Sequence, residues 1–96
     1  MLIHSIQEQI PGVEIYIESL LPISEKKEKN YGSNKKIEEF NQQLSDLSNR
    51  EALTFVDLWS VYENNGVMNE YYTKDGLHLQ EEGYYYWVEE IKKYIE

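Results

Sequence analysis

The stretch that decides the fold begins at Asp75-Gly76-Leu77-His78-Leu79 and runs on into a helical pattern. The pentapeptide places a carboxylate and an imidazole three residues apart in one tight turn. In a Ser-His-Asp triad the carboxylate orients the imidazole that takes the nucleophile's proton, so these two side chains must meet in space. The turn therefore supplies candidates for two of the three members of such a triad. Asp-Gly is also a common turn dipeptide, so a purely structural turn with an incidental histidine is the alternative.

The segment after the turn is predicted to be a helix that packs on a core. Its apolar residues recur at helical spacing and form one stripe, which is typical of a core-facing surface rather than a cofactor site: Tyr84, Trp87, Val88, Ile91 and Ile95. Gly83 lowers helix propensity by roughly 1 kcal/mol relative to Ala. We therefore expect another backbone to approach Gly83 closely, near the His78 turn.

Two apolar runs upstream are predicted to be strands, Val13–Leu21 and Leu53–Trp59. Pro22 ends the first run, and ligands of open α/β sheets gather outside the carboxyl ends of the strands. Pro22 and Ile23 are therefore candidate substrate contacts, with an ordinary strand exit as the alternative. Tyr72, which lies just before the turn, is a third candidate contact, and covering the edge of the sheet is its alternative role.

Helical spacing predicts two further helices. One covers residues 2–10 and ends before Pro11, and the other covers Ile37–Leu47, with Ser33 or Asn34 as its cap. The polar segment Glu25–Asn34 between the first strand and this second helix is predicted to be a mobile loop.

Three polar features are given structural interpretations. Asp57 lies in a mostly apolar strand, where a carboxylate is costly unless it is paired. We expect it to bind a neighbouring backbone or to orient a loop, and a catalytic role is the alternative. Asn41 lies one position off the apolar stripe and is interpreted as a helix-flank amide. Asn64-Asn65-Gly66 is expected to form a turn.

Composition limits the class of protein. At 96 residues the chain is one domain or part of one. The absence of cysteine excludes disulfides, zinc-thiolate sites and a cysteine nucleophile. A net charge of -9 argues against nucleic acid or an anionic membrane as partner. No segment approaches the ~20 apolar residues of a transmembrane helix, and the first ten residues lack the basic region of a signal peptide. The compartment is left open.

The order of residues from Tyr72 through Asp75-Gly76-Leu77-His78-Leu79 to Glu82-Gly83-Tyr84 and Trp87 resembles the last sequence block of the SGNH, or GDSL-type, ester hydrolases. The upstream elements also resemble that family: its fourth strand and following loop, the next helix and its fifth strand correspond to Val13–Ser24, Ile37–Leu47 and Leu53–Trp59. The resemblance covers nearly the whole chain, but only the C-terminal half of the family's domain. It implies that Asp75 is the triad acid, that His78 is the base, that the substrate is a small-molecule ester and that no cofactor or metal is needed.

The family's nucleophile and oxyanion motifs are missing from the sequence. Neither a Gly-Asp-Ser nor a Gly-x-Ser-x-Gly motif surrounds any of the seven serines, which are Ser5, Ser19, Ser24, Ser33, Ser45, Ser48 and Ser60. We therefore expect residues 1–96 to form a single partial domain, the C-terminal half of a three-layer α/β/α flavodoxin-like SGNH hydrolase. It would contain three helices and two parallel strands, and the two strands would be joined by a right-handed crossover. Ester hydrolysis would then require a nucleophile supplied from elsewhere.

Two other functions stay open. The chain is alternatively an inactive fold fragment or interaction module in which Asp75 and His78 are remnants. A metal site is the second alternative, since Asp75 and His78 with Glu81 or Glu82 would suit a hydrolytic zinc, although His4 is the one other imidazole.

The first strand also carries a prediction about association. In the family's strand order, one backbone edge of Val13–Leu21 has lost its neighbour, and an unpaired apolar edge is a template for pairing. We therefore expect a homodimer or a larger assembly formed through this edge.

Overall fold

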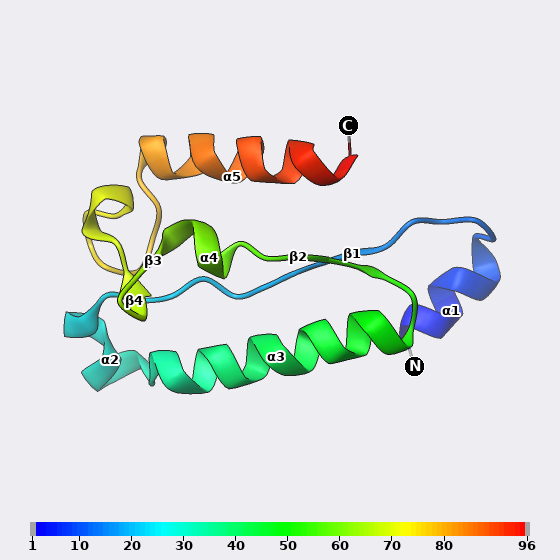
Figure 1. The fold of residues 1–96 in the computed structure, drawn as a ribbon, viewed down its shortest axis with the longest axis horizontal. Coiled ribbons are helices and arrows are strands. Elements are labelled where there is room, and N and C mark those ends of the chain that lie inside the picture. The colour runs from blue at the N-terminus through cyan, green and yellow to red at the C-terminus, as the bar shows by residue number, and fades with distance from the viewer. Residues whose placement is uncertain (1, 96) are drawn as a thin grey trace.

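The chain folds into three layers around a short parallel sheet (Figure 1). A computed structural model describes residues 2–95. The strands β1 (Tyr16–Glu18) and β2 (Thr54–Val56) pair in parallel, with Ile17 opposite Phe55. Helix α3 (Asn34–Arg50) lies on one side of the strands and α5 (Glu81–Ile95) on the other. The predicted α/β/α arrangement with two parallel strands is confirmed.

The described residues contain more elements than the three helices and two strands that the sequence predicted. Two of those helices are α3 and α5, and the third is α1 at the N-terminus. The additional elements are short and lie mostly between β2 and α5. The bounds not yet given are α1 (Leu2–Gln9), α2 (Glu25–Tyr31), α4 (Trp59–Tyr62), β3 (Glu63–Asn64), β4 (Val67–Met68) and the 3₁₀ helix η1 (Glu70–Tyr72). The antiparallel β3–β4 pair encloses the predicted turn, where Asn65 and Gly66 both have positive φ.

Most of the predicted mobile loop Glu25–Asn34 is in fact the helix α2, so that prediction was wrong. Lysine and glutamate favour helix, and acids in the first turn with a lysine in the last turn complement the helix dipole. Gly32, at φ 107°, donates its N–H to the carbonyl of Glu28 and ends the helix. The glycine therefore marks a helix terminus and not a flexible segment. Of the two predicted caps of α3, Ser33 and Asn34, it is Ser33 that caps the helix, by accepting the N–H of Lys36.

Both strands are shorter than predicted, and at their C-terminal ends the buried hydroxyl of Ser19 takes over from strand pairing. Its oxygen accepts the N–H groups of Leu58 and Trp59, each at 2.9 Å. Satisfying these two buried amides lets the chain leave the sheet after Val56 and start α4 at Trp59. The predicted strand Leu53–Trp59 therefore divides into a strand and a helix.

Two asparagines of α3 hold the extended chain that follows β1. Asn41 accepts the N–H of Leu20 at 2.7 Å and donates to its carbonyl at 3.0 Å, and Asn34 makes the same pair of bonds to Ile23, both at 2.8 Å. The two residues lie two helical turns apart, on one face of α3. Both side chains are buried, so the interpretation of Asn41 as a helix-flank amide was wrong. The two asparagine side chains therefore satisfy the backbone groups of Leu20 and Ile23 that a neighbouring strand would otherwise pair with.

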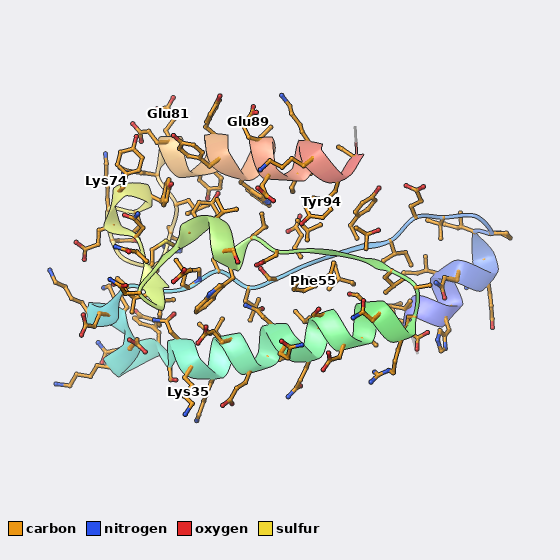
Figure 2. The ribbon with its side chains drawn as sticks, viewed as in Figure 1. Lys35, Phe55, Lys74, Glu81, Glu89 and Tyr94 are labelled. Atoms are coloured by element: carbon orange, nitrogen blue, oxygen red, sulfur yellow. The ribbon has the colours of Figure 1, made fainter. Side chains whose placement is uncertain are left out.

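The core lies between the sheet and α5. Its buried members are Val56, Leu58, Tyr62 and Met68, against which residues of α5 such as Trp87 and Ile91 pack. Figure 2 shows Phe55 on the α3 side of the sheet and Tyr94 reaching from α5 toward the strands.

The close backbone approach expected at Gly83 is confirmed. A Cβ there would lie 2.9 Å from the carbonyl oxygen of Tyr72, and the Gly83 carbonyl accepts the hydroxyl of Tyr62. This packing fixes the start of α5 against the segment that leads into the His78 turn. Within residues 2–95, no helix combines the length and the apolarity needed to cross a membrane.

Candidate active site

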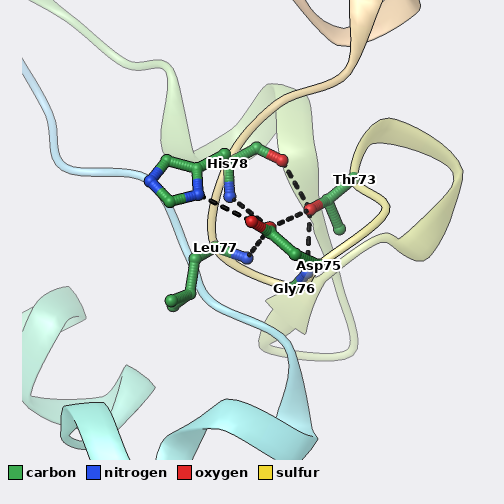
Figure 3. A network of polar contacts seen from close by, with 5 residues as sticks. All are labelled: Thr73, Asp75, Gly76, Leu77 and His78. Atoms are coloured by element: carbon green, nitrogen blue, oxygen red, sulfur yellow. Dashed lines mark hydrogen bonds and ion pairs between the residues drawn. The ribbon is translucent and has the colours of Figure 1, made fainter.

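Asp75 and His78 meet in the turn between η1 and α5 (Figure 3). One carboxylate oxygen of Asp75, Oδ1, accepts the backbone N–H groups of Leu77 at 2.8 Å and His78 at 2.7 Å. The other oxygen, Oδ2, lies 2.7 Å from His78 Nδ1. The carboxylate therefore shapes the turn with one oxygen and orients the imidazole with the other.

The charge state of Asp75 fixes the tautomer of His78. Hydrogen bonds from the backbone N–H of His78, from its imidazole and from the N–H of Leu77 hold the pKa of Asp75 well below its usual value. An ionised carboxylate only accepts hydrogen bonds, so Nδ1 carries the hydrogen of the neutral imidazole. Nε2 then keeps its lone pair as a base. Because 79% of the His78 side chain is exposed, an approaching group can reach the imidazole.

The turn is anchored from behind through Gly76. Its carbonyl accepts the N–H of Ser24 at 3.0 Å, and a Cβ at Gly76 would lie 2.3 Å from Ser24 Oγ. Its φ of 86° is also one that other residues rarely adopt. The backbone of Ile23, held by Asn34, immediately precedes Ser24, so α3 supports the turn through this loop.

An apolar pocket of about 280 Å³ adjoins His78, which forms part of its wall. The pocket lies between the end of β1, the turn and α5, and its main apolar lining residues are Leu20, Leu21, Leu58, Leu77, Tyr84 and Trp87. The indole N–H of Trp87 is buried and has no hydrogen-bond acceptor within the described part of the chain. A group bound in this pocket would therefore lie beside His78. The sequence had indicated Tyr84 and Trp87 only as core residues, and no local pattern distinguished Leu20 or Leu77.

The three predicted substrate contacts lie elsewhere. Pro22 is fully buried, and Ile23 is held by its backbone. The ring of Tyr72 packs edge-on against the rings of Tyr62 and Tyr86, with centroids 5.1 and 5.4 Å away. None of the three lines the pocket beside His78. Their roles as ligand contacts stay predictions.

Ser19 and Asp57 have structural roles. Ser19 lines the same pocket as His78, but it is 5% exposed and its oxygen accepts two backbone amides, which suits a structural hydroxyl rather than a nucleophile. Asp57 accepts the N–H of Ser60 at 3.1 Å and its hydroxyl at 2.6 Å, at the start of α4. This is the backbone pairing that the sequence predicted for Asp57.

The donor set of the metal alternative is not assembled. Among residues 2–95, no group of three or more histidine, aspartate and glutamate side chains is arranged to hold an ion. Neither Glu81 nor Glu82 joins Asp75 and His78 in such a group, and His4 pairs instead with Glu51.

Comparison with known proteins points to one family. The model of the GDSL-like lipase/acylhydrolase family matches residues 1–86. A solved structure from Streptococcus pneumonia, described as a proposed platelet activating factor, is 31% identical with a TM-score of 0.87 and covers 99% of this chain and 47% of its own.

Two more distant structures share the fold. One is a proposed acylhydrolase from Bacteroides fragilis, at 22% identity and TM-score 0.79, covering 98% of this chain and 47% of its own. The other is the esterase domain of the zebrafish ZfL2-1 retrotransposon ORF1 protein, at 18% identity and TM-score 0.76, covering 98% and 52%. The chain thus spans about half the length of these structures. No curated protein matches it.

Proposed function

The chain belongs to the GDSL-like lipase/acylhydrolase family, and we propose that Asp75 and His78 are the acid and the base of a Ser-His-Asp triad that hydrolyses carboxylic esters. Its α/β/α fold is the flavodoxin-like fold of the SGNH hydrolases to which it is similar. The observation that carries the proposal is the 2.7 Å contact between Asp75 Oδ2 and His78 Nδ1. The other carboxylate oxygen is already held by two amides, so the carboxylate has a fixed orientation toward the ring.

The proposed reaction uses His78 twice. A serine hydroxyl from a segment outside these residues attacks the acyl carbon while Nε2 of His78 takes its proton, and the ionised Asp75 stabilises the imidazolium. The imidazolium then protonates the leaving alcohol, which departs as the carbon–oxygen bond of the ester breaks. Water next attacks the acyl-serine, and His78 again takes and returns one proton. In this scheme the chain contributes the proton-transferring imidazole and the carboxylate that orients it, and the nucleophile comes from outside these residues.

A fusion protein tests the proposal. The part of the Streptococcus pneumonia protein that this chain does not cover is joined upstream of it, and hydrolysis of a nitrophenyl ester is measured. We expect His78→Ala to abolish turnover, Asp75→Asn to reduce it by up to about 10⁴-fold, and His4→Ala, the matched control, to leave it unchanged. The 96 residues alone should hydrolyse the ester no faster than free imidazole, because they lack the nucleophile motif.

Two outcomes of the fusion experiment contradict the proposal. Turnover that survives His78→Ala would show that another group acts as the base. A folded fusion that binds an ester analogue without hydrolysing it would favour the alternative of an inactive interaction module.

We also propose that the chain self-associates through the open edge of β1. Ile15 accepts the N–H of Thr54 and Ser19 donates to Val56, so the odd-numbered residues of this strand face β2. By the alternation of a parallel strand, the backbone groups of Tyr16 and Glu18 face the opposite edge. Leu20 belongs to that edge too, but Asn41 already occupies both of its backbone groups. The edge available for pairing is therefore shorter than the predicted Val13–Leu21.

Sedimentation velocity tests this association. Two copies paired through Glu14–Glu18 would form a four-stranded sheet around a two-fold axis. Added salt should strengthen the dimer, because each copy carries a net charge of -9. Glu18→Pro removes an outward N–H and should dissociate the dimer, whereas Glu18→Gln, which changes charge alone, should not. A monomer at every micromolar concentration and salt level would contradict the proposal.

A further inference from the structure

Thr73 is buried at the centre of the turn that carries Asp75 and His78. Only 5% of the residue is exposed, and its backbone forms an isolated antiparallel bridge with Leu79 that closes the base of the turn. Its Oγ1 lies 2.9 Å from the N–H of Gly76 and 2.6 Å from the carbonyl oxygen of His78. Figure 3 shows this hydroxyl inside the loop of the turn, linked to Gly76, Asp75 and His78.

The direction of each bond follows from the chemistry of its atoms. A carbonyl oxygen only accepts, so the single hydroxyl hydrogen of Thr73 is donated to His78. The N–H of Gly76 is the donor toward the same oxygen. Asp75 Oδ1, at the longer distance of 3.3 Å, is at most a second and weaker acceptor of the same hydrogen. Its main donors are the two backbone amides of Leu77 and His78.

The backbone of His78 is consequently held at both ends. Asp75 accepts its N–H and Thr73 donates to its carbonyl. With the backbone of His78 fixed in this way, the imidazole reaches Asp75 Oδ2 by side-chain rotation alone. Threonine suits this position because branching at Cβ restricts its χ1 angle, so the hydroxyl loses little rotational freedom when it makes these bonds.

We propose that Thr73 is a positioning residue for the Asp75–His78 pair: its hydroxyl fixes the His78 carbonyl and so holds the imidazole against the Asp75 carboxylate, which in turn favours the Nδ1–H tautomer. The catalytic meaning of this role rests on the proposed function. The geometric role does not, since it concerns contacts within the chain itself.

The tautomer of each histidine is measurable in the 96-residue chain by long-range ¹H–¹⁵N correlation of labelled histidine. His78 Nδ1 faces Asp75, whereas His4 Nε2 faces Glu51 Oε2 at 2.5 Å. The two histidines of the chain should therefore be in opposite tautomers, Nδ1–H for His78 and Nε2–H for His4. His4 serves as an internal control in every spectrum.

Three substitutions separate the hydroxyl from the shape of the side chain. Thr73→Val keeps the shape and removes the hydroxyl, and we expect the ratio of Nδ1–H to Nε2–H tautomer at His78 to fall by roughly fivefold, the loss of one net hydrogen bond. Thr73→Ser keeps the hydroxyl and should preserve the ratio. Thr54→Val makes the same chemical change on the exposed side of β2 and should alter neither histidine.

A measurement on the unmodified chain covers the case in which Thr73→Val fails to fold. The N–H of Gly76 should be protected from hydrogen exchange, since Thr73 accepts it. Fast exchange of this amide, or an unchanged His78 tautomer in folded Thr73→Val, would overturn the proposal. The failure of the proposed function looks different: the tautomer would respond to Thr73→Val while the fusion enzyme ignored His78→Ala.

Discussion

Replacing Gly76 by alanine tests the contact that anchors the turn carrying Asp75 and His78. Gly76 has φ 86°, which costs an L-residue about 1–2 kcal/mol. The added Cβ would also lie 2.3 Å from Ser24 Oγ and 3.0 Å from Lys27 Cγ. Both distances are below ordinary van der Waals contact, so a side chain or the loop must move. Overpacking of this kind typically costs about 1–3 kcal/mol.

Two other glycines provide matched controls. Gly66 has nearly the same φ, 84°, but a Cβ added there would meet nothing within 4 Å, so Gly66→Ala should cost only the backbone term of about 1–2 kcal/mol. Gly83 has no positive φ but would meet the carbonyl oxygen of Tyr72 at 2.9 Å, so Gly83→Ala shows the steric term reduced by the roughly 1 kcal/mol of helix propensity that alanine gains. Gly76→Ala should show both terms together, about 2–5 kcal/mol.

Urea unfolding followed by far-ultraviolet circular dichroism measures these differences. We expect Gly76→Ala to be about 1–3 kcal/mol less stable than Gly66→Ala. Adding Ser24→Ala to Gly76→Ala should recover part of the loss, because it removes Oγ while Ser24 Cβ, at 3.1 Å, stays. Equal losses in Gly66→Ala and Gly76→Ala would refute the inferred contact between the turn and the loop after β1.

Three further predictions concern single side chains. Asn34→Ala leaves the Ile23 N–H without its acceptor and should lower the free energy of urea unfolding by about 1–3 kcal/mol. Asn49→Ala on the exposed face of α3 should change it by no more than about 0.5 kcal/mol, and equal effects would contradict a stabilising role of the Asn34–Ile23 hydrogen bond. Hydrogen bonds lower the pKa of Asp75, so its contribution to stability is present above about pH 3.8 and is lost as the pH falls through its lower folded pKa. Thermal unfolding of Asp75→Asn should lack this acid dependence, and parallel plots of melting temperature against pH for the two proteins would argue against the hydrogen-bonded carboxylate. Burial raises the pKa of Tyr62 to about 12 from 10.0, so its contribution to folding stability is complete below pH 10 and is lost as the pH rises to about 12. The tyrosinate absorbance that appears at the highest pH should be missing in Tyr62→Phe, and its persistence would assign that absorbance to another tyrosine.

Local patterns determined the parts of the site that lie within one turn. Asp75 and His78 are three residues apart, so a single turn is enough to bring the carboxylate to the imidazole. The glycine at position 83 indicated a close backbone approach for a similar reason, because its cost in a helix needs a local cause. The helical stripe of α5 was right in part: Trp87 and Ile91 pack against the core together with Tyr94. The other three predicted core residues are exposed, Tyr84 at 47%, Val88 at 51% and Ile95 at 60%, because the core meets a narrower face of the helix.

The tertiary structure decided the contacts between segments that are distant along the chain. Asn41 binds Leu20 across 21 residues, and Ser19 binds Leu58 across 39, so neither contact follows from spacing or propensity. An asparagine of α3 can lie exposed on the flank of the helix or bind the backbone of another segment, and which of the two occurs depends on the face of α3 that meets the extended chain. The same holds for the pocket beside His78, whose walls come from β1, the turn and α5. Sequence periodicity specifies which face of an element is apolar, but the partner of that face is set only when all elements pack together.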